Sequence, residues 1–478
     1  MRSPVWKRIA SVCALWLASS LAGSAQTFKT LVNFNGANGS HPALVILAQG
    51  RDGNLWGTAQ SGGIFSYGTI FRLTPGGTLT TAYSFDLATG AFPDVGLTLG
   101  RDNYFYGVNG GGGVNGYGVV FTITPTGSYT VIFNFDGTNG TAPEDALTQG
   151  IDGNFYGTTS YGPPGVGPCG ANGCGTIFKI SPKGTATTLW VFDLNPDGAF
   201  PLGGLLQATD GNFYGTASAG GIPNVCTPYE GCGTVFRITP GGTLTLIHRF
   251  QFTDGAYPAA GLIQGSDGNL YGTTEFGGTN KHGTVFKITL GGTLTTLYNF
   301  TGSADGKLPY APLVEGTDGN FYGTTVSGGS SIACAGGCGT IFQITSAGVL
   351  TTLHTFTGTD GDESVGGLVQ HSNGLFYGTT EFGGASDLGT IFSIDMGLGP
   401  FIKTTTTLGK VGSRVQILGQ GLTGSTSVTF NGTPAMTFNV DGDTYMTAIV
   451  PTGATTGPVQ VTTPTGTLTS NVNFRVAP

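Results

Sequence analysis

An eight-residue stretch that recurs seven times is the feature that most constrains the fold of this chain. Its clearest copy, DGNFYGTT, begins at Asp152, and the glycine after the aromatic residue returns at intervals of 50 to 58 residues. A repeat of this length is typical of one supersecondary unit copied around an axis or along a solenoid. The copies begin at Asp52, Asp102, Asp152, Asp210, Asp267, Asp318 and Asn373.

Each copy predicts four short β-strands. In the fifth copy we expect strands over residues 260–265, 270–274, 283–289 and 294–300. The Asp-Gly and Gly-Gly pairs between them are hairpin signals, because such turns need positive φ angles. A four-stranded antiparallel unit repeated seven times predicts an all-β chain whose main domain is a β-propeller.

The two ends of the repeat region predict that the ring closes. The last copy ends after its third strand, near Ile394, and a strand of the fourth type, residues 28–34, precedes the first copy. This N-terminal strand can complete the seventh blade and close a seven-bladed propeller over residues 27–395. An open β-solenoid is the alternative, but it would not explain the displaced strand.

Residues 1–25 predict a signal peptide. Arg2, Lys7 and Arg8 precede an apolar run over residues 9–21, and small residues follow at 23–25. A membrane anchor is the alternative, but the run is short for a bilayer span, and no second stretch is long enough. Cleavage leaves 15 Lys and Arg against 26 Asp and Glu, a net charge of −11, which disfavours nucleic acid as a partner.

Six cysteines remain after cleavage, and they occur as three close pairs in equivalent loops of different repeats. An even count, local spacing and a secreted context predict three disulfide bonds. Metal binding is the alternative, but each pair supplies only two thiolates and a structural zinc needs four ligands. The pairs are Cys169 with Cys174, Cys226 with Cys232, and Cys334 with Cys338.

Length variation is concentrated in the loops that follow the second strand of each repeat. These loops range from residues 277–282 to the insert over residues 160–173, and they contain all three cysteine pairs. The connections between repeats carry a second motif, Asx-Gly-x-x-Pro, as in Asp305 to Pro309. In a propeller both sets of loops share one face, where recognition is usually built on a rigid scaffold.

The repeat pattern stops after Ile394. A glycine-rich linker over residues 396–400 precedes a region of different character, residues 401–478, with short β runs between turn residues. About 78 residues of this kind predict a small β-sandwich.

The motifs also carry a family resemblance. The DGNFYGTT…GTVFKI units resemble the tandem repeats of the choice-of-anchor "GloVer" type in bacterial secreted proteins, over about residues 28–395. They depart from the pattern at Asn103, which replaces the turn glycine, and at Asn373, which replaces the aspartate. Residues 400–478 resemble the IPT/TIG immunoglobulin-like domain through VGSRVQILGQGL, VTFNGTPA and GPVQVTTPTG. The resemblance implies an exported, surface-associated protein and brings no catalytic residues.

The recurrent residues have structural explanations. We expect the strand aromatics, such as Tyr156, to fill the space between blades and the Asp-Gly-Asn aspartates to form Asx turns. Sequence signatures of serine hydrolases, zinc proteases, P-loops and EF-hand calcium sites are absent, so we assign no catalytic residue, metal site or cofactor. Six acidic residues remain to be inspected for a paired-carboxylate site: Glu144, Asp145, Glu275, Asp362, Glu363 and Glu381.

Three functions remain open. The leading hypothesis is a secreted or cell-surface, non-catalytic binding or adhesion protein, monomeric, that recognises a glycan or an extracellular protein through its variable face. The second is a carbohydrate-active hydrolase or lyase with carboxylates at the propeller mouth. The third is a structural spacer of the envelope. The predicted ligand-binding residues are Tyr161, Glu275, Phe276, Glu381 and Phe382.

Overall fold

The computed structural model describes residues 26–165, 168–226 and 231–477, so the predicted signal peptide lies outside the described residues. Within them the chain is almost entirely β, with one turn of 3₁₀ helix, η1 (Gly170–Asn172). None of the described helical structure is long and apolar enough to cross a bilayer.

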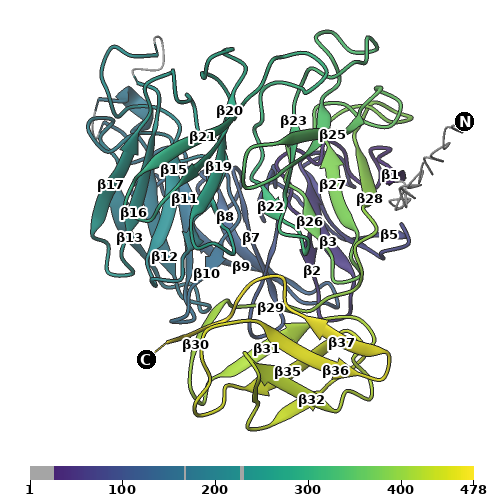
Figure 1. The fold of residues 1–478 in the computed structure, drawn as a ribbon. Helices are drawn as coiled ribbons and strands as arrows, with labels where there is room; N and C mark the ends of the chain where they lie inside the picture. The colour runs from purple at the N-terminus through teal and green to yellow at the C-terminus, as the bar shows by residue number, and fades with distance from the viewer. Residues whose placement is uncertain (1–25, 166–167, 227–230, 478) are drawn as a thin grey trace, which may run out of the picture.

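Seven four-stranded antiparallel sheets, one for each repeat, make up the described part of residues 27–395. Figure 1 shows these sheets standing above a separate C-terminal module, which is coloured yellow. In six sheets the four strands follow one another in both sequence and space. The all-β prediction is therefore confirmed, and the arrangement is propeller-like.

The first strand of each sheet is shorter than predicted. The structure has two residues in strand β18 where the sequence predicted six, and the chain just before it bends, with the Ala259 amide donating to Tyr257 O at 2.9 Å. Such γ-turns curl the chain away from the second strand. The first strands are β2 (Ala48–Gln49), β6 (Thr98–Leu99), β10 (Thr148–Gln149), β14 (Leu206–Gln207), β18 (Ile263–Gln264), β22 (Val314–Glu315) and β26 (Val369–Gln370).

The second strand is the FYGTT part of the repeat, and all its residues are buried. Its glycine is required by close packing. A Cβ on Gly157 would lie 2.7 Å from Leu147 Cδ2 and 2.7 Å from Phe178 Cζ. The second strands are β3 (Leu55–Ala59), β7 (Phe105–Asn109), β11 (Phe155–Thr159), β15 (Phe213–Ala217), β19 (Leu270–Thr274), β23 (Phe321–Thr325) and β27 (Phe376–Thr380).

The third strand is also largely buried, whereas the fourth is partly exposed at the outer edge of each sheet. The third strands are β4 (Thr69–Leu73), β8 (Val119–Ile123), β12 (Thr176–Ile180), β16 (Thr234–Ile238), β20 (Thr284–Ile288), β24 (Thr340–Ile344) and β28 (Thr390–Asp395). The fourth strands are β5 (Leu79–Ser84), β9 (Tyr129–Asn134), β13 (Ala186–Val191), β17 (Leu244–Arg249), β21 (Leu294–Asn299), β25 (Leu350–Thr355) and, in the seventh sheet, β1 (Thr27–Asn33).

The N-terminal strand closes the ring, as the sequence predicted. β1 pairs antiparallel with β28, with Thr27 opposite Asp395 and Asn33 opposite Thr390. The same strand contributes Val32 to a buried cluster that also contains Leu55 of the first repeat and Tyr377 of the seventh. The seventh sheet therefore packs against the first, which an open solenoid would not allow.

Aromatic stacking joins neighbouring sheets. Tyr156 stacks on Phe213 of the next repeat with ring centroids 4.0 Å apart, and four other sheet pairs use the same contact at 3.9 to 4.7 Å. Each such pair adds about 0.5–1.5 kcal/mol beyond the area it buries. The phenol of Tyr156 donates to Asp152 at 2.9 Å, and the same carboxylate accepts the Asn154 amide at 3.1 Å. The inter-sheet role of the aromatics and the Asx turns are both confirmed.

Residues 401–477 form two four-stranded sheets that share one buried core, with Ile417 from one sheet and Val461 from the other, and a parallel strand pair beside them. The first sheet contains β29 (Lys403–Thr404), β31 (Arg414–Leu418), β35 (Tyr445–Ile449) and β34 (Phe438–Val440). The second contains β33 (Thr433–Pro434), β32 (Ser427–Phe430), β36 (Val459–Thr463) and β37 (Gly466–Thr469), and the pair is β30 (Leu408–Lys410) with β38 (Arg475–Ala477).

The module contacts the face of the ring that contains the Asp-Gly-Asn turns, which we call the module face. Thr444 Oγ1 donates to Arg51 O at 2.6 Å, and Ser372 Oγ donates to Gly419 O at 3.1 Å. The opposite face, which we call the loop face, contains the loops after the second strands, such as residues 275–283 and 326–339. It lies at the top of Figure 1, away from the module.

Candidate functional site

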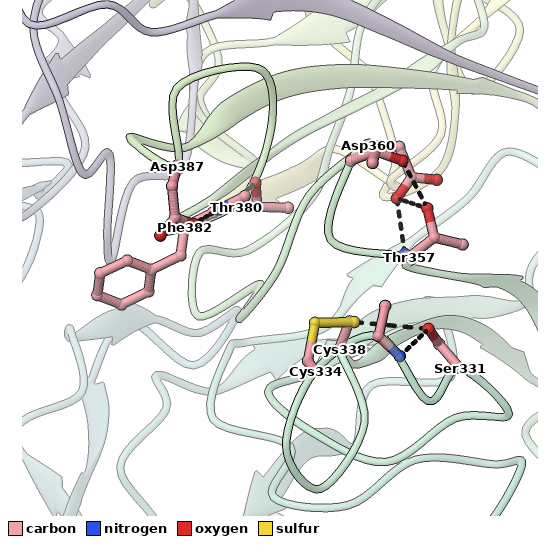
Figure 2. The surroundings of a disulfide bond; sticks show 11 residues. Ser331, Cys334, Cys338, Thr357, Asp360, Thr380, Phe382 and Asp387 are labelled. Carbon is pink, nitrogen blue, oxygen red and sulfur yellow. Dashed lines mark hydrogen bonds between the residues drawn. A yellow bond between two sulfur atoms is a disulfide. The ribbon is translucent and has the colours of Figure 1, made fainter.

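The Asx-Gly-x-x-Pro loops on the loop face use their acidic or amide side chain to close the loop. Asp305 accepts the Thr301 amide at 2.7 Å. Asp360, at the same position of the seventh repeat, where Ser364 replaces the proline, accepts the Thr357 amide at 2.7 Å. Figure 2 shows the second of these contacts. The predicted turn role of this residue is confirmed, and its carboxylate is already occupied by the backbone.

The fourth residue of the motif, which precedes a proline in six repeats and Ser364 in the seventh, adopts a left-handed conformation in every repeat, with φ between 52° and 59°. This conformation costs a non-glycine residue about 1 kcal/mol or more. Its carbonyl accepts the amide of the residue that follows the second strand, as in Glu275 N to Tyr257 O at 3.1 Å and Glu381 N to Glu363 O at 3.0 Å. The strained bend therefore holds the connection between repeats against the end of the second strand. The seven residues are His41, Phe92, Ala142, Phe200, Tyr257, Leu308 and Glu363.

An axial cavity of about 360 Å³ lies where the inner parts of the repeats meet. Its wall includes Ile46, Asp145, Leu262 and Leu368 from four different repeats. Asn471 and Val472 of the module also line it, so the module covers the cavity at the module face. Access to the axis therefore lies on the loop face.

Carboxyl groups from different repeats lie close enough for their charges to interact. The charges of Glu144 and Glu381 both raise the pKa of Asp94, although these residues belong to the third, seventh and second repeats. The pKa of Tyr310, from the sixth repeat, is raised by burial and by the charges of Glu275, Glu144 and Asp145. We call this group the acidic mouth: Asp94, Glu144, Asp145, Glu275, Tyr310 and Glu381.

Burial is the largest influence on the acidic groups of the mouth. It raises the pKa of Asp94, Asp145 and Glu275 to about 7 in each case. Backbone amides of Ala146 and Gly204 oppose the shift at Asp145, which is half-buried at the cavity wall. Glu275 is raised by burial alone. These carboxyls are therefore poised between their charged and neutral forms near neutral pH.

The hydrogen bonding of the mouth is incomplete. Glu144 Oε2 accepts the Ser160 hydroxyl at 2.6 Å, which partly offsets the rise that burial causes in its pKa. Asp94 Oδ1 is buried and has no hydrogen-bond partner. A buried acceptor without a partner costs about 1–3 kcal/mol, so a ligand that donates to Asp94 would recover that free energy.

Two hollows lined by aromatic residues adjoin the mouth. The larger, about 620 Å³, is lined by Tyr161, Phe200 and Tyr257 together with Ser160, the partner of Glu144. The smaller, about 220 Å³, is lined by Tyr257 and Phe276. Tyr257 belongs to both, so the aromatic surface is continuous from one hollow to the other. Flat apolar rings beside hydrogen-bonding groups are suited to stacking against sugar rings.

The predicted site residues divide between these regions. Glu275 and Glu381 lie in the acidic mouth, and Tyr161 and Phe276 line the hollows. Phe382 instead packs edge-on against His41, with ring centroids 5.1 Å apart. Their role in binding stays a prediction.

The remaining acidic candidates have different surroundings. Glu144 and Asp145 belong to the mouth, and the charge of Glu363 raises the pKa of Glu381. Asp362 lies apart, with a carboxylate oxygen within 4.8 Å of the sulfurs of Cys334 and Cys338. Those sulfurs are bonded to each other, so they cannot serve as thiolate ligands of a metal.

All three predicted disulfides are present: Cys169–Cys174, Cys226–Cys232 and Cys334–Cys338. The first two line the larger and smaller hollows. Figure 2 shows the third, with Ser331 beside Cys338 at 3.6 Å. The cross-links therefore fix loops of the loop face, including the walls of both hollows.

Sequence reasoning missed Asp94 and Tyr310. Both directly follow a proline at the motif position, as Glu144 does. The motif copy that precedes Asp94 begins with Thr89 in place of an aspartate or asparagine, so it does not match Asx-Gly-x-x-Pro. Comparing the residue after each motif proline would have found both.

Residues 226–446 match the Gloeobacter/Verrucomicrobia repeat. The predicted resemblance to this repeat is confirmed over that range, which includes the fifth and sixth sheets of the ring and three strands of the seventh. No curated protein sequence matches the chain.

Two solved structures are similar in fold. A fungal alcohol oxidase of the AA5 family, in complex with copper, has a TM-score of 0.51 at 12% identity, covering 95% of this chain and 99% of the oxidase. Virginiamycin B lyase from Staphylococcus aureus has a TM-score of 0.48 at 15% identity, covering 77% of this chain and 98% of the lyase. At such identities the likeness to the oxidase concerns the fold alone.

Proposed function

We propose that this chain is a secreted or cell-surface binding protein that takes a glycan at the acidic mouth. In this proposal residues 27–395 form a seven-bladed β-propeller, residues 396–400 are a linker, and residues 401–478 are an immunoglobulin-like module of the IPT/TIG type. The seven sheets with their closed ring and the two-sheet core of the module support this architecture.

The convergence of carboxyl groups from separate repeats carries the functional proposal. Repetition alone would place the same residue in every copy, whereas the mouth takes Asp94, Glu144 and Tyr310 from one loop position and Glu275 and Glu381 from another. Carboxyls accept hydrogen bonds from sugar hydroxyls, and the aromatic walls stack on the ring faces. Differences between repeats at these positions would set which glycan fits.

Three disulfides support an oxidising compartment, because such bonds persist in secreted proteins and are rare in the cytosol. The residues predicted to direct export precede the described region.

A glycan array on the mature chain, followed by calorimetry on the best ligand, tests the proposal. Replacing Glu275 and Glu381 with Gln, and Phe276 and Phe382 with Ala, should weaken binding at least about tenfold, because hydrogen bonds and stacking surface are lost together. Asp387→Asn is the control, since Asp387 is exposed on the same face and Asn retains its acceptor for the Gly383 amide. If the fourfold variant binds the glycan unchanged and a change in an Asp-Gly-Asn turn abolishes binding, the ligand lies on the module face and the proposal is wrong.

A hydrolase or lyase is the second candidate, because a carboxyl with a pKa of about 7 can act as a general acid at neutral pH. Glycoside hydrolysis needs such an acid and a second carboxyl across the scissile bond. A panel of polysaccharide substrates on the mature chain tests this. Turnover that is lost in both Asp94→Asn and Glu275→Gln would support an enzyme, and turnover that survives both would exclude catalysis by the mouth.

If the array and the substrate panel are both negative, the third hypothesis, a structural spacer of the envelope, becomes the leading one.

A further inference from the structure

A further hollow, separate from the mouth and the hollows beside it, lies where the C-terminal module meets the module face. It has a volume of about 650 Å³ and is lined by residues of the first two repeats and of strands β31 and β35. Three of its lining residues are Arg51, Arg101 and Arg414. The whole chain carries a net charge of −8, so three guanidinium groups in one hollow form a local exception.

None of these guanidinium groups has a carboxylate partner among the described residues. The ion pairs at 4.0 Å or closer in that part of the chain are His248 with Asp254 and His354 with Asp360. Arg51 and Arg101 instead donate to backbone carbonyls, Arg51 to Arg101 O at 2.7 Å and Arg101 to Gly150 O at 3.1 Å. Arg51 Nε is buried and has no partner.

The arginines of the ring are departures from the repeat. Both occupy the position before the acidic residue of the turn, where the other five copies have Ile151, Thr209, Ser266, Thr317 and Ser372. Arginine therefore occurs at this position only in the two adjacent repeats that line the hollow. The fold of a repeat does not require it, since five copies fold without it.

The module completes the arrangement. Tyr445 places its ring against Arg51, with the guanidinium carbon 4.4 Å from the ring centroid, which holds the flat group in one orientation. Gln416 donates to Arg101 O at 2.7 Å, but its own Oε1 is buried without a partner. Arg414 is exposed and donates to Thr447 at 3.5 Å, a long and therefore weak contact.

We propose that this hollow binds a small ligand with one oxyanionic group, a carboxylate or a phosphate, carried beside hydroxyl groups. Guanidinium groups present a rigid fork of donors that matches both oxyanions. Asp52 and Asp441 also line the hollow and are exposed. They repel a polyanion and accept hydrogen bonds from hydroxyls, which favours a single oxyanionic group on a hydroxylated molecule such as a uronic acid or a sugar phosphate. The ligand would contact both the ring and the module, and so hold the two together.

Calorimetry and thermal unfolding of the full mature chain test the site with glucuronate, glucose 6-phosphate and inorganic phosphate, with neutral glucose as the uncharged probe. We expect at least one charged probe to bind and raise the unfolding temperature, with an affinity that falls as salt is added, and no response to glucose. Binding of glucuronate alone assigns a carboxylate ligand, and binding of the phosphates alone assigns a phosphate ligand. A concentration of about 10 mM exceeds the dissociation constant of a weak complex, about 1 mM. No response to any charged probe at that concentration would overturn the proposal.

Arg414→Gln locates the binding. Arg414 is exposed and makes only the long contact to Thr447 in this hollow, so the variant should fold normally and bind the charged probe at least about tenfold more weakly. Arg237→Gln is the matched control, since Arg237 donates to a threonine on the neighbouring strand at 3.4 Å but lies in the fourth repeat. Equal affinity in the Arg414→Gln variant and the wild type would show that the anion binds elsewhere. Glycan binding at the mouth should be unchanged by either variant, so the two sites can fail independently.

Discussion

Asp94 illustrates the conflict between stability and binding at the level of single residues. Its Oδ1 atom is buried without a partner, and its pKa is raised to about 7 by burial and by the charges of Glu144 and Glu381. If Asp94 served only the scaffold, it would destabilise the fold and contribute nothing in exchange. Active and binding sites often retain such strain, because a ligand relieves it.

The pH dependence of stability should reveal this strain. The folded pKa of Asp94 lies above its unfolded value, so stability is fully present below about pH 4 and is lost as the pH rises through 7. Asp94→Asn removes the ionisation and should stabilise the ligand-free chain by about 1–3 kcal/mol at pH 8, with little effect at pH 4. Thermal unfolding of both proteins between pH 4 and pH 8 provides the measurement. A variant that is less stable than the wild type at pH 8 would contradict the assignment.

At the level of elements, strand β1 gives the contact between the seventh and first sheets, which we call the seam, the same packing as other contacts between neighbouring sheets. Phe34, just after β1, is fully buried, and so is Phe300, its counterpart after β21. Phe34 packs edge-on against Phe71 at 5.7 Å, and Phe300 packs in the same way against Phe342 at 5.3 Å. The seam therefore has the same packing as an internal junction, although it joins opposite ends of the chain.

Phe34→Ala and Phe300→Ala should cost the same free energy of unfolding, about 3–5 kcal/mol each, because each leaves a comparable cavity. Urea unfolding of the two variants measures the comparison. A much smaller cost for Phe34→Ala would mean that the seam is loose in solution and the ring stands partly open.

The elements also separate what the sequence could predict from what it could not. The FYGTT strands and the position of the strand over residues 28–34 were predictable, because turn glycines and alternating apolar residues mark them directly. The two-residue length of β18 was not, because γ-turns at positions such as Ala259 depend on how the chain curls around the axis. The acidic mouth was predicted only in part, since nothing in one repeat says which residues of other repeats will face it.

At the level of the whole molecule, the position of the module could not be predicted from the sequence. It is held by contacts to backbone carbonyls, such as Thr444 Oγ1 to Arg51 O, and any residue provides such an acceptor. Around the same region the first and seventh repeats meet through His371, whose Nε2 lies 2.9 Å from Gly53 O. The neighbouring Ser372 bonds the module at Gly419. Ring closure and module docking thus share one buried junction.

Acid should weaken this junction. Burial, with a smaller contribution from the charge of Lys403, lowers the pKa of His371 to about 4. Because the folded pKa lies below the unfolded value of about 6.5, stability is lost as the pH falls from about 6.5 to 4. His371→Gln removes this ionisation, so the variant should lose about 1–3 kcal/mol less stability than the wild type over this pH range. The mouth carboxyls titrate in both proteins, so their opposite effect cancels in the difference. Identical pH profiles of the two proteins would show that His371 titrates normally.

The pairing of β1 with β28 also has a consequence for the order of assembly. Thr27 is among the first described residues of the chain to be synthesised, and its partner Asp395 comes only after all seven repeats. Contacts this far apart in sequence form slowly, because the entropy of loop closure opposes them before they can stabilise the fold, although that cost rises only slowly with loop length. Strand β1 has no β28 to pair with until the seventh repeat is present, so we expect the ring to close late in folding.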